Sequence, residues 1–337
     1  MGKNIDKYKE IESELNFGAY SEEIPKISIV IPTYNRDHLL KEALISALNQ
    51  DTSEIYEIIV VEDLPEKDSK IERLIKEINN PKIILYKNKK NLGLFGNWNR
   101  CLELARTEWI CMLHDDDILF PNYISTIYKT INENKNADFI FYKPLVIDLR
   151  NQSVADVNIE SKEDIEVKKV LSQFFMRGDE LTGIVGICFK KSIATKIDGF
   201  KEEMYPSSDW EFFYRYSKEG NIYKYENFPI ALYRFGENES LKPKTIEGFV
   251  YKDFEIKNYI MKDLNFRYKN MIKDYLKIMT LKHVDTLERK HPGVLDKKQI
   301  IKDLNLDYNF FNKLNYRVYK TYLAILEAKN KWKIHLR

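Results

Sequence analysis

Apolar runs and amphipathic stretches alternate along the first two thirds of the chain and predict strands and helices in turn. The predicted strands are short and apolar throughout, which is typical of strands that are buried on both faces. They lie at 27–31, 57–61, 83–86, 109–113 and 138–142. The predicted helices carry apolar residues on one face and lie at 37–48 (capped by Asp37), 69–78, 97–105 and 121–134. This order predicts an α/β fold with a mostly parallel sheet flanked by helices.

The remaining segments follow other patterns. Residues 1–24 read as an amphipathic helix or a loose arm, and residues 150–180 as a polar, helical connection. Further strands are predicted at 183–189, 222–225 and 230–234, with a helix at 209–218. From about residue 248 the spacing predicts a helical C-terminal region that is broken once, at Pro292-Gly293.

Composition places the chain among globular proteins, with 44% hydrophobic and 31% charged residues in a length of 337. No apolar run approaches the roughly 18 residues that span a bilayer, and residues 1–26 lack an apolar signal core. Cys101, Cys111 and Cys188 are scattered in apolar surroundings, which favours buried free thiols and a cytoplasmic location. The five histidines are also scattered, so a zinc centre is not predicted.

Charge divides the chain into two parts. Residues 251–337 contain 20 Lys and Arg against 10 Asp and Glu, which leaves 34 against 42 in residues 1–250. The basic, Tyr-rich tail suggests an anionic partner, such as membrane phospholipid at the inner face of the plasma membrane or a phosphorylated acceptor. A homodimer contact or a merely solvated lysine surface are the alternatives. Acidic residues are interspersed and no recognised module is present, so no nucleic-acid partner is predicted.

The run His114-Asp115-Asp116-Asp117 directly follows an apolar strand and is the strongest candidate for chemistry. Carboxylate oxygens suit Mg²⁺ or Mn²⁺, which commonly bring substrate phosphates with them. A solvated acidic turn is the alternative. Because ligands of α/β sheets bind at the carboxyl ends of the strands, residues 32–36 and 62–63 at neighbouring strand ends are expected nearby.

Two residues at those ends offer nucleotide contacts. Tyr34 presents a ring that could stack on a base, and Asp63 could accept an N–H from a pyrimidine or cap a helix. Neither GxGxxG, GxxxxGK[ST] nor GxSxG is present, so a glycine-rich phosphate loop and a serine nucleophile are not predicted. A metal-bridged diphosphate fits the acidic run better.

Taken together, these segments resemble the inverting glycosyltransferases of family 2, which have the GT-A fold. The resemblance covers about residues 25–240. It rests on Pro32-Thr33-Tyr34-Asn35-Arg36, Val60-Val61-Glu62-Asp63, Asn91-Leu92-Gly93, Asn97-Trp98-Asn99, Leu113 to Asp117, and Ser208-Asp209-Trp210-Glu211.

The resemblance implies a role for each matching residue. Asp116 would bind Mn²⁺ or Mg²⁺, and Asp209 would be the catalytic base, although in isolation Asp209 also reads as a helix cap. Gly186 and Trp210 would lie on the acceptor side. The nucleotide sugar would be bound by Pro32, Tyr34, Arg36, Asp63, Asn91, Gly93, Asp115 and Asp117.

The chain departs from the family pattern at two places. His114 occupies the first aspartate position of the usual Asp-x-Asp motif. The segment from Tyr233 to Glu237 lacks the histidine that follows Tyr-Arg in some relatives, which leaves the third metal ligand open, with Glu237 as a candidate.

The implied activity is metal-dependent transfer of a sugar, with inversion, from a nucleotide-diphosphate sugar to a hydroxyl of a glycan, lipid-linked or protein-linked acceptor, as in polysaccharide biosynthesis. A UDP-sugar is the expected donor. The expected organisation is an arm (1–24), a GT-A domain (25–247) and a helical C-terminal appendage (248–337). One alternative is a non-catalytic partner that keeps the fold. Another is a sugar nucleotidyltransferase, although residues 31–36 lack the glycines that such enzymes carry.

Overall fold

The computed structural model describes residues 4–149, 164–178, 180–181, 183–236, 238–264 and 269–335. The strands are β1 (Ser13–Phe17), β2 (Ile27–Thr33), β3 (Tyr56–Glu62), β4 (Ile83–Asn88), β5 (Trp109–Met112), β6 (Ile118–Leu119), β7 (Phe139–Tyr142), β8 (Leu145–Asp148), β9 (Asp164–Val170), β10 (Ile187–Lys190), β11 (Ile222–Glu226), β12 (Ala231–Phe235) and β13 (Lys331–His335). The helices are α1 (Asp37–Leu48), α2 (Lys70–Ile78), α3 (Leu94–Leu104), α4 (Tyr123–Glu133), α5 (Lys191–Lys196), α6 (Ser208–Glu219), α7 (Pro243–Asp263), α8 (Lys269–Lys290), α9 (Lys297–Asp303) and α10 (Phe310–Lys329).

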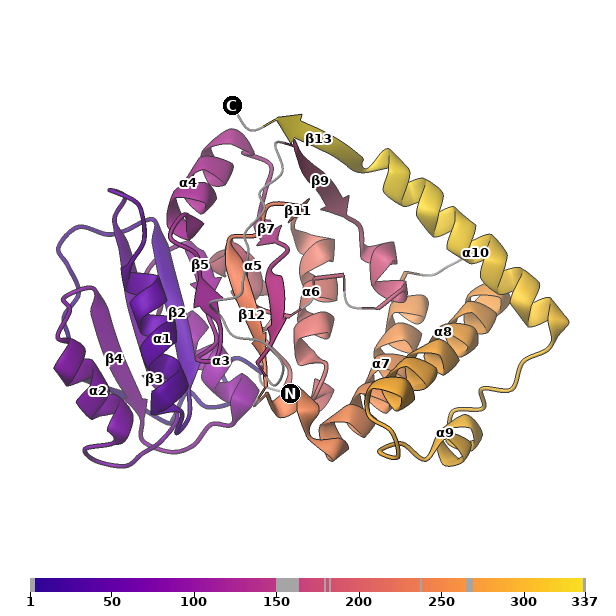
Figure 1. The fold of residues 1–337 in the computed structure, drawn as a ribbon, viewed down its shortest axis with the longest axis horizontal. Helices are drawn as coiled ribbons and strands as arrows, with labels where there is room; N and C mark the ends of the chain where they lie inside the picture. Colours follow the sequence, from indigo (N-terminus) through magenta and orange to yellow (C-terminus); the bar gives the residue numbers. More distant parts are fainter. Residues whose placement is uncertain are drawn as a thin grey trace.

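Ten strands form one twisted sheet in the order β1-β4-β3-β2-β5-β10-β7-β11-β9-β13 (Figure 1). The central strands β4, β3, β2 and β5 are parallel, as predicted. Outside this block most neighbours pair antiparallel, so the sheet as a whole is mixed. A small second sheet, β6-β12-β8, lies beside it.

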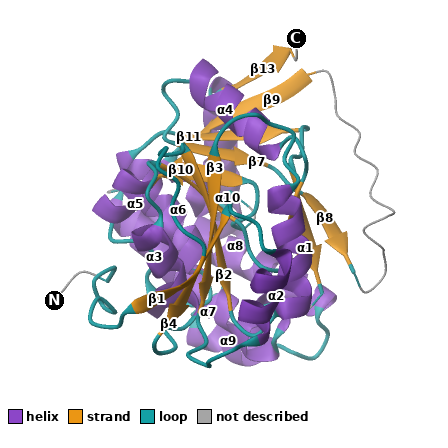
Figure 2. Ribbon diagram, turned by 90° about the vertical axis from the view of Figure 1, so that its left-hand side faces the viewer, coloured by secondary structure: helices purple, strands orange, loops and turns teal. Residues whose placement is uncertain are grey.

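Helices cover both faces of the large sheet, because successive side chains of a strand point to opposite faces. Ile29 and Ile31 of β2 pack in a cluster with α1, α2 and α4, while Val30 packs in a second cluster with α3, α6 and α7. Figure 2 shows α1 and α2 on one side of the strands and α3, α5 and α6 on the other. The three cysteines are buried and free, as predicted.

Four local predictions were wrong. Residues 4–24 form turns and β1 rather than the expected helix or loose arm, because β1 pairs with β4. Asp37 is the first residue of α1, and Arg36 holds the cap position. In the region 150–180, residues 164–170 form β9 instead of a helix. The C-terminal region also contains β13, which pairs with β9 at the edge of the sheet.

A buried ion-pair cluster joins α2 to β4. Lys87 of β4 donates to Glu72 Oε2 at 2.9 Å, and Lys76 donates to Glu72 Oε1 at 2.7 Å. The hydrogen bonds from Lys76 and then Lys87 lower the pKa of Glu72 from 4.5 to about 2. Glu72 therefore stabilises the fold when it is ionised.

Replacing Glu72 with glutamine should lower the free energy of unfolding at pH 7 by about 1–3 kcal/mol, because charge-assisted hydrogen bonds are lost. The folded-state pKa lies below the ordinary value, so this contribution is present above pH 4.5 and is lost as the pH falls towards 2. Urea unfolding at several pH values should show the gap between the two proteins closing below pH 4.5. Glu77→Gln, an exposed change on the same helix, is the control, and a gap that does not change with pH would contradict the assignment.

Candidate functional site

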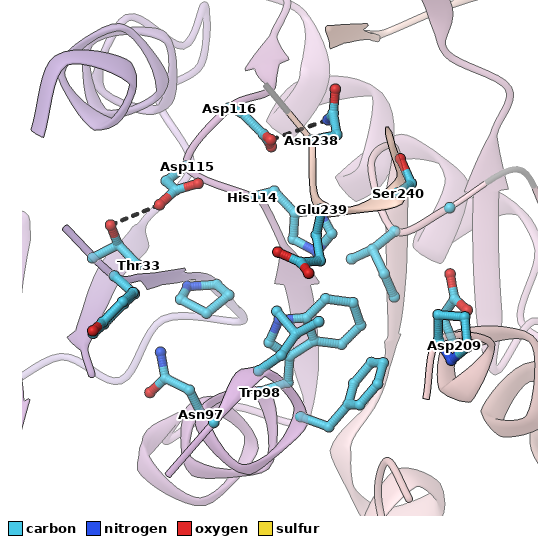
Figure 3. Close-up of a pocket in the computed structure, with 18 of the residues that line it drawn as sticks. Thr33, Asn97, Trp98, His114, Asp115, Asp116, Asp209, Asn238, Glu239 and Ser240 are labelled. Atoms are coloured by element: carbon cyan, nitrogen blue, oxygen red, sulfur yellow. Dashed lines mark hydrogen bonds between the residues drawn. The ribbon is translucent and has the colours of Figure 1, made fainter. Parts of the chain in front are cut away.

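A cavity of about 550 Å³ opens at the carboxyl ends of β2, β3 and β5 (Figure 3). Its walls come from the loops after these strands, the first turns of α3 and α6, and the start of α7. It brings together nine of the predicted site residues: Pro32, Tyr34, Arg36, Asp63, Asn91, Gly93, Asp115, Asp116 and Asp209. Asp117, Gly186 and Trp210 do not line it.

Asp63 organises one end of the cavity. Its Oδ1 accepts from Leu92 N and Asn88 Nδ2, both at 2.8 Å, and its Oδ2 accepts from Gly93 N at 3.0 Å. Gly93 has φ of +75°, a conformation that glycine adopts without strain. Burial raises the pKa of Asp63 above its usual value, against these hydrogen bonds. Asp63 therefore holds the loop around Asn91, and the side chain of Tyr34 (53% exposed) lines the same cavity.

Asp115 and Asp116 both form an ion pair with the guanidinium group of Arg36. Arg36 Nη1 lies 3.3 Å from Asp115 Oδ1 and 3.1 Å from Asp116 Oδ2. Thr33 Oγ1 donates to Asp115 Oδ2 at 2.8 Å, and Asn238 Nδ2 donates to Asp116 Oδ2 at 3.1 Å. Burial, followed by the neighbouring charge of Asp116, raises the pKa of Asp115 to about 6. The two carboxylates are thus crowded and only partly compensated.

Asp117 is fully buried behind its neighbours. Its Oδ1 accepts from Arg234 N at 3.0 Å, while its Oδ2 has no hydrogen-bond partner among the described residues and lies 3.8 Å from His114 Nδ1. His114 Nε2 likewise lacks a hydrogen-bond partner within the described part of the chain. Burial raises the pKa of Asp117 and lowers the pKa of His114, so both tend towards neutrality. Such buried polar atoms are costly unless something binds them.

These groups could hold a divalent ion. His114, Asp116 and Asp117 each offer a ligand atom, and the three atoms lie within 4.8 Å of one another. An imidazole with carboxylate oxygens suits Mn²⁺ or Mg²⁺. Glu237, the other predicted ligand candidate, lies outside the described residues.

Asp209 lies across the cavity from Asp115 and Asp116 (Figure 3). It is half-buried in the first turn of α6, and its Oδ1 accepts from Trp210 N at 2.8 Å. Ser207 holds the N-cap position of this helix but makes no side-chain cap hydrogen bond. Asp209 therefore lines the cavity from the start of α6.

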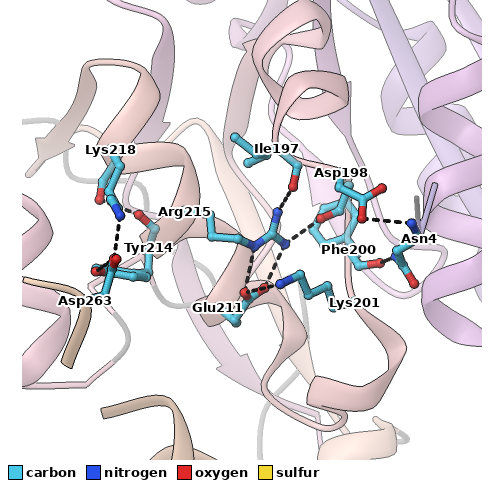
Figure 4. A network of polar contacts seen from close by, with 12 residues as sticks. Asn4, Ile197, Asp198, Phe200, Lys201, Glu211, Tyr214, Arg215, Lys218 and Asp263 are labelled. Atoms are coloured by element: carbon cyan, nitrogen blue, oxygen red, sulfur yellow. Dashed lines mark hydrogen bonds and ion pairs between the residues drawn. The ribbon is translucent and has the colours of Figure 1, made fainter. Parts of the chain in front are cut away.

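A buried ion pair fixes the helix that carries Asp209 (Figure 4). Glu211 is fully buried and accepts from Arg215 Nε and Nη2, both at 2.7 Å. Arg215 also donates to the carbonyl oxygen of Gly199 at 2.6 Å, and Lys201 Nζ lies 3.4 Å from Glu211. These contacts hold α6 against the loop at 197–201, so Glu211 positions the first turn rather than lining the cavity.

The two acceptor-side predictions lie behind the cavity wall. Trp210 is 2% exposed, and Lys257 of α7 lies 5.2 Å from its ring centre. Gly186 has φ of +81° and lies buried in the turn before β10, where its carbonyl oxygen accepts from Tyr142 N at 2.9 Å. Gly183 and Ile184 line the cavity in their place. Trp210 is buried because it packs inward from α6, as aromatic side chains commonly do.

Several lining residues escaped the sequence prediction. Asn238, Glu239, Tyr205, Thr245 and Phe249 come from segments that carry none of the quoted motifs. The sequence gives a partial signal for Asn238, which follows Tyr233-Arg234 closely, in the segment where the third metal ligand is left open. Phe249 lies beyond the predicted boundary at residue 247, and α7 runs across that boundary. Which residues line the cavity depends on how distant segments pack together, and local sequence patterns do not encode this packing.

Comparison with known proteins identifies the family of the chain. The family model of Glycosyl transferase family 2 matches residues 28–231. An uncharacterized glycosyltransferase of Methanocaldococcus jannaschii is 28% identical over 240 residues, which is 70% of this chain and 79% of the relative. A GalNAc(5)-diNAcBac-PP-undecaprenol beta-1,3-glucosyltransferase of Campylobacter jejuni is 32% identical over 222 residues, which is 65% of this chain and 67% of the relative.

A solved structure supports the fold. TarS residues 1–349 of S. aureus, in complex with UDP-GlcNAc, superposes with a TM-score of 0.60 at 19% identity, covering 83% of this chain and 80% of that chain. The predicted GT-A fold class and the predicted enzyme class, a glycosyltransferase, are confirmed. With the family match extending over most of the α/β core, the chain belongs to glycosyl transferase family 2 and transfers sugar from a nucleotide sugar.

Proposed function

We propose that the enzyme transfers a sugar from a UDP-sugar, with inversion and with the help of Mn²⁺ or Mg²⁺, to a hydroxyl of a glycan, lipid-linked or protein-linked acceptor. One observation carries the proposal. Asp115 and Asp116 face Asp209 from the opposite side of a single cavity (Figure 3). A donor diphosphate beside the first pair and a base at the other side is the arrangement that a single inverting displacement requires.

Asp63 is the proposed base-reading residue. A carboxylate accepts hydrogen bonds, and uracil and thymine each carry a donor N–H at ring position N3, whereas cytosine has an acceptor there. The backbone amides of Leu92 and Gly93 hold the Asp63 carboxylate in place for such a contact. Tyr34 is proposed to stack on the base, with Pro32, Asn91 and Gly93 around it.

His114, Asp116 and Asp117 are the proposed ligands of the divalent ion, with Asp116 as the direct ligand from the cavity side. The ion, when bound, supplies positive charge to the diphosphate leaving group. Arg36 already lies between Asp115 and Asp116, so its guanidinium is near enough to contact the same phosphates. Asp115 is proposed to contact the ribose or the donor sugar.

Asp209 is the proposed general base. It would accept the proton of the acceptor hydroxyl while that oxygen attacks the anomeric carbon from the face opposite the leaving group. Gly183, Ile184 and Phe249 also line the cavity and would contact the acceptor. Trp210 and Gly186 lie behind the cavity wall, so they would support the acceptor side of the cavity without lining it.

The division into an arm (1–24), a transferase domain (25–247) and a C-terminal region (248–337) stays a proposal. Thr245 and Phe249 lie on either side of the boundary at residue 247, and both line the cavity.

Of the described helices, none is both long enough and apolar enough to cross a membrane. We propose that the enzyme works in the cytoplasm, where it takes up its nucleotide sugar. We also propose that the C-terminal region contacts a membrane or a second copy of the chain.

Calorimetric titration with UDP, dTDP, CDP, GDP and ADP tests the donor assignment. In the presence of Mn²⁺, UDP should bind and CDP should bind at least about tenfold more weakly, because Asp63 would face an acceptor instead of a donor. Adding EDTA should weaken UDP binding. Folded protein that binds none of these nucleotides would contradict the proposal and favour a non-catalytic partner.

A further inference from the structure

Helix α10 presents an apolar stripe to the solvent. The outward stripe consists of six large side chains that are 43–75% exposed: Phe310, Phe311, Leu314, Val318, Tyr322 and Ile325. Five of them recur every three or four residues, so they form one row along the helix. Figure 1 shows α10 as an outer element of the C-terminal region, packed on α8. Single exposed apolar residues are common, but a continuous row of this length marks an interaction surface.

The fold holds the outward stripe in this orientation. On the opposite face of α10, Tyr319 and Leu323 are 1% and 0% exposed and belong to the main hydrophobic cluster. Asn312 Nδ2 and Asn315 Nδ2 each donate to a carboxylate oxygen of Asp274 on α8 at 2.6 Å. Rotating the stripe inward would break these bonds and expose the buried pair. The exposure is therefore built into the packing of the helix.

Positive charge accompanies the stripe. Residues 308–335 contain six Lys and Arg (Lys313, Arg317, Lys320, Lys329, Lys331 and Lys333) and one acidic residue. That residue, Glu327, is engaged by Lys168 at 2.8 Å and by Arg177 at 2.5 Å, so its charge is neutralised locally. Lys313, Arg317 and Lys320 follow one edge of the stripe at helical spacing.

We propose that the outward stripe of α10 docks on an anionic phospholipid surface. A helix with aromatic and aliphatic residues on one face and lysine or arginine beside it lies in the plane of a membrane interface. The aromatic rings enter the headgroup region and the basic edge meets the lipid phosphates. This docking is independent of the sugar transfer proposed above.

Charge disfavours a second copy of the chain as the occupant. In an antiparallel pair of α10 helices, the same edge of each helix meets its counterpart. Lys313, Arg317 and Lys320 would then face their own copies. Glu327 continues that edge, but its charge is already paired with Lys168 and Arg177. Like charges opposed in this way destabilise a pair, whereas an anionic bilayer supplies the missing counter-charge.

Vesicle flotation of the whole chain tests the proposal. Vesicles that contain phosphatidylglycerol should bind the protein, vesicles of phosphatidylcholine alone should bind it far less, and added salt should weaken binding. Phe311→Ser with Val318→Ser should lower the partition coefficient at least about tenfold. Arg317→Glu with Lys320→Glu should lower it by a similar factor and flatten the salt dependence.

Ile24→Ser with Val146→Ser is the matched control, because these side chains are 70% and 57% exposed but lie far from α10 in sequence. Circular dichroism and UDP titration would verify that every variant is folded. Equal binding to neutral vesicles, or full binding by the stripe variant, would overturn the proposal. A stable dimer that Phe311→Ser dissociates would also overturn it, since a second copy would then cover the stripe.

Discussion

Replacing Asp209 with asparagine is expected to lower the rate of sugar transfer by about 10²–10⁴-fold, the usual contribution of one general base. Asparagine keeps the shape of the side chain and an oxygen that can accept from Trp210 N, so the first turn of α6 should stay intact. It cannot take up a proton from the acceptor hydroxyl. UDP affinity should change little, because Asp209 lies across the cavity from Asp115 and Asp116.

Transfer from a radiolabelled UDP-sugar, measured beside calorimetric UDP titration, separates the two effects. Glu219→Gln is the control, because it makes the same carboxylate-to-amide change at the opposite end of α6. If the Asp209→Asn enzyme kept its normal rate, another group would have to be the base. Equal losses of UDP affinity and rate would instead indicate that Asp209 serves donor binding.

The second large effect concerns the metal. Asp116→Asn is expected to weaken UDP binding in the presence of Mn²⁺ by about 100-fold or more, since changes in a metal's surroundings alone typically cost 10–100-fold. In EDTA the variant and the natural protein should bind UDP equally. Both measurements use calorimetric titration. Asp37→Asn is the control, because Asp37 is the first residue of α1 and does not line the cavity.

The same change should not harm the fold. The charge of Asp116 helps to raise the pKa of Asp115 and of Asp117, which means that the three carboxylates repel one another. Removing one charge relieves that repulsion, and the asparagine can still accept from Asn238. The unfolding free energy should fall by less than about 1 kcal/mol. Unchanged Mn²⁺-dependent binding would remove Asp116 from the metal site.

The sequence predicts the parts of the fold that depend on local pattern. Strands such as β2 and β3 are buried throughout, and α2 lies at Lys70–Ile78, where the sequence predicts a helix over 69–78. Asp209, at the start of α6, is expected from the family resemblance alone. The positions of Asp63 and Asp115 in one cavity follow from the rule that strand ends meet at one edge of a parallel sheet. Their positions can be predicted from that rule without knowing how distant segments pack.

What escaped prediction depends on distant partners. In β9, Lys168 is 3% exposed and is buried only because Glu180 and Glu327 reach it from other segments. The charge of Lys168 contributes to the polar pattern of residues 150–180, and this pattern predicts a helical connection instead of a strand. In β13, Trp332 and Ile334 alternate with polar residues, but the segment is only five residues long and its pairing partner lies far away in the chain. Asn238 and Phe249 reach the cavity through tertiary packing in the same way.

The pairing of β13 with β9 has a consequence for synthesis on the ribosome. Lys331 pairs with Lys168, 163 residues earlier, so the outer edge of β9 has no partner until nearly the whole of this sequence has been made. At about 5–20 residues per second, that interval is roughly 8–30 s. A nascent chain with an open edge can pair with another chain. Once β13 arrives, its lysines at 331 and 333 form the new edge and discourage such pairing.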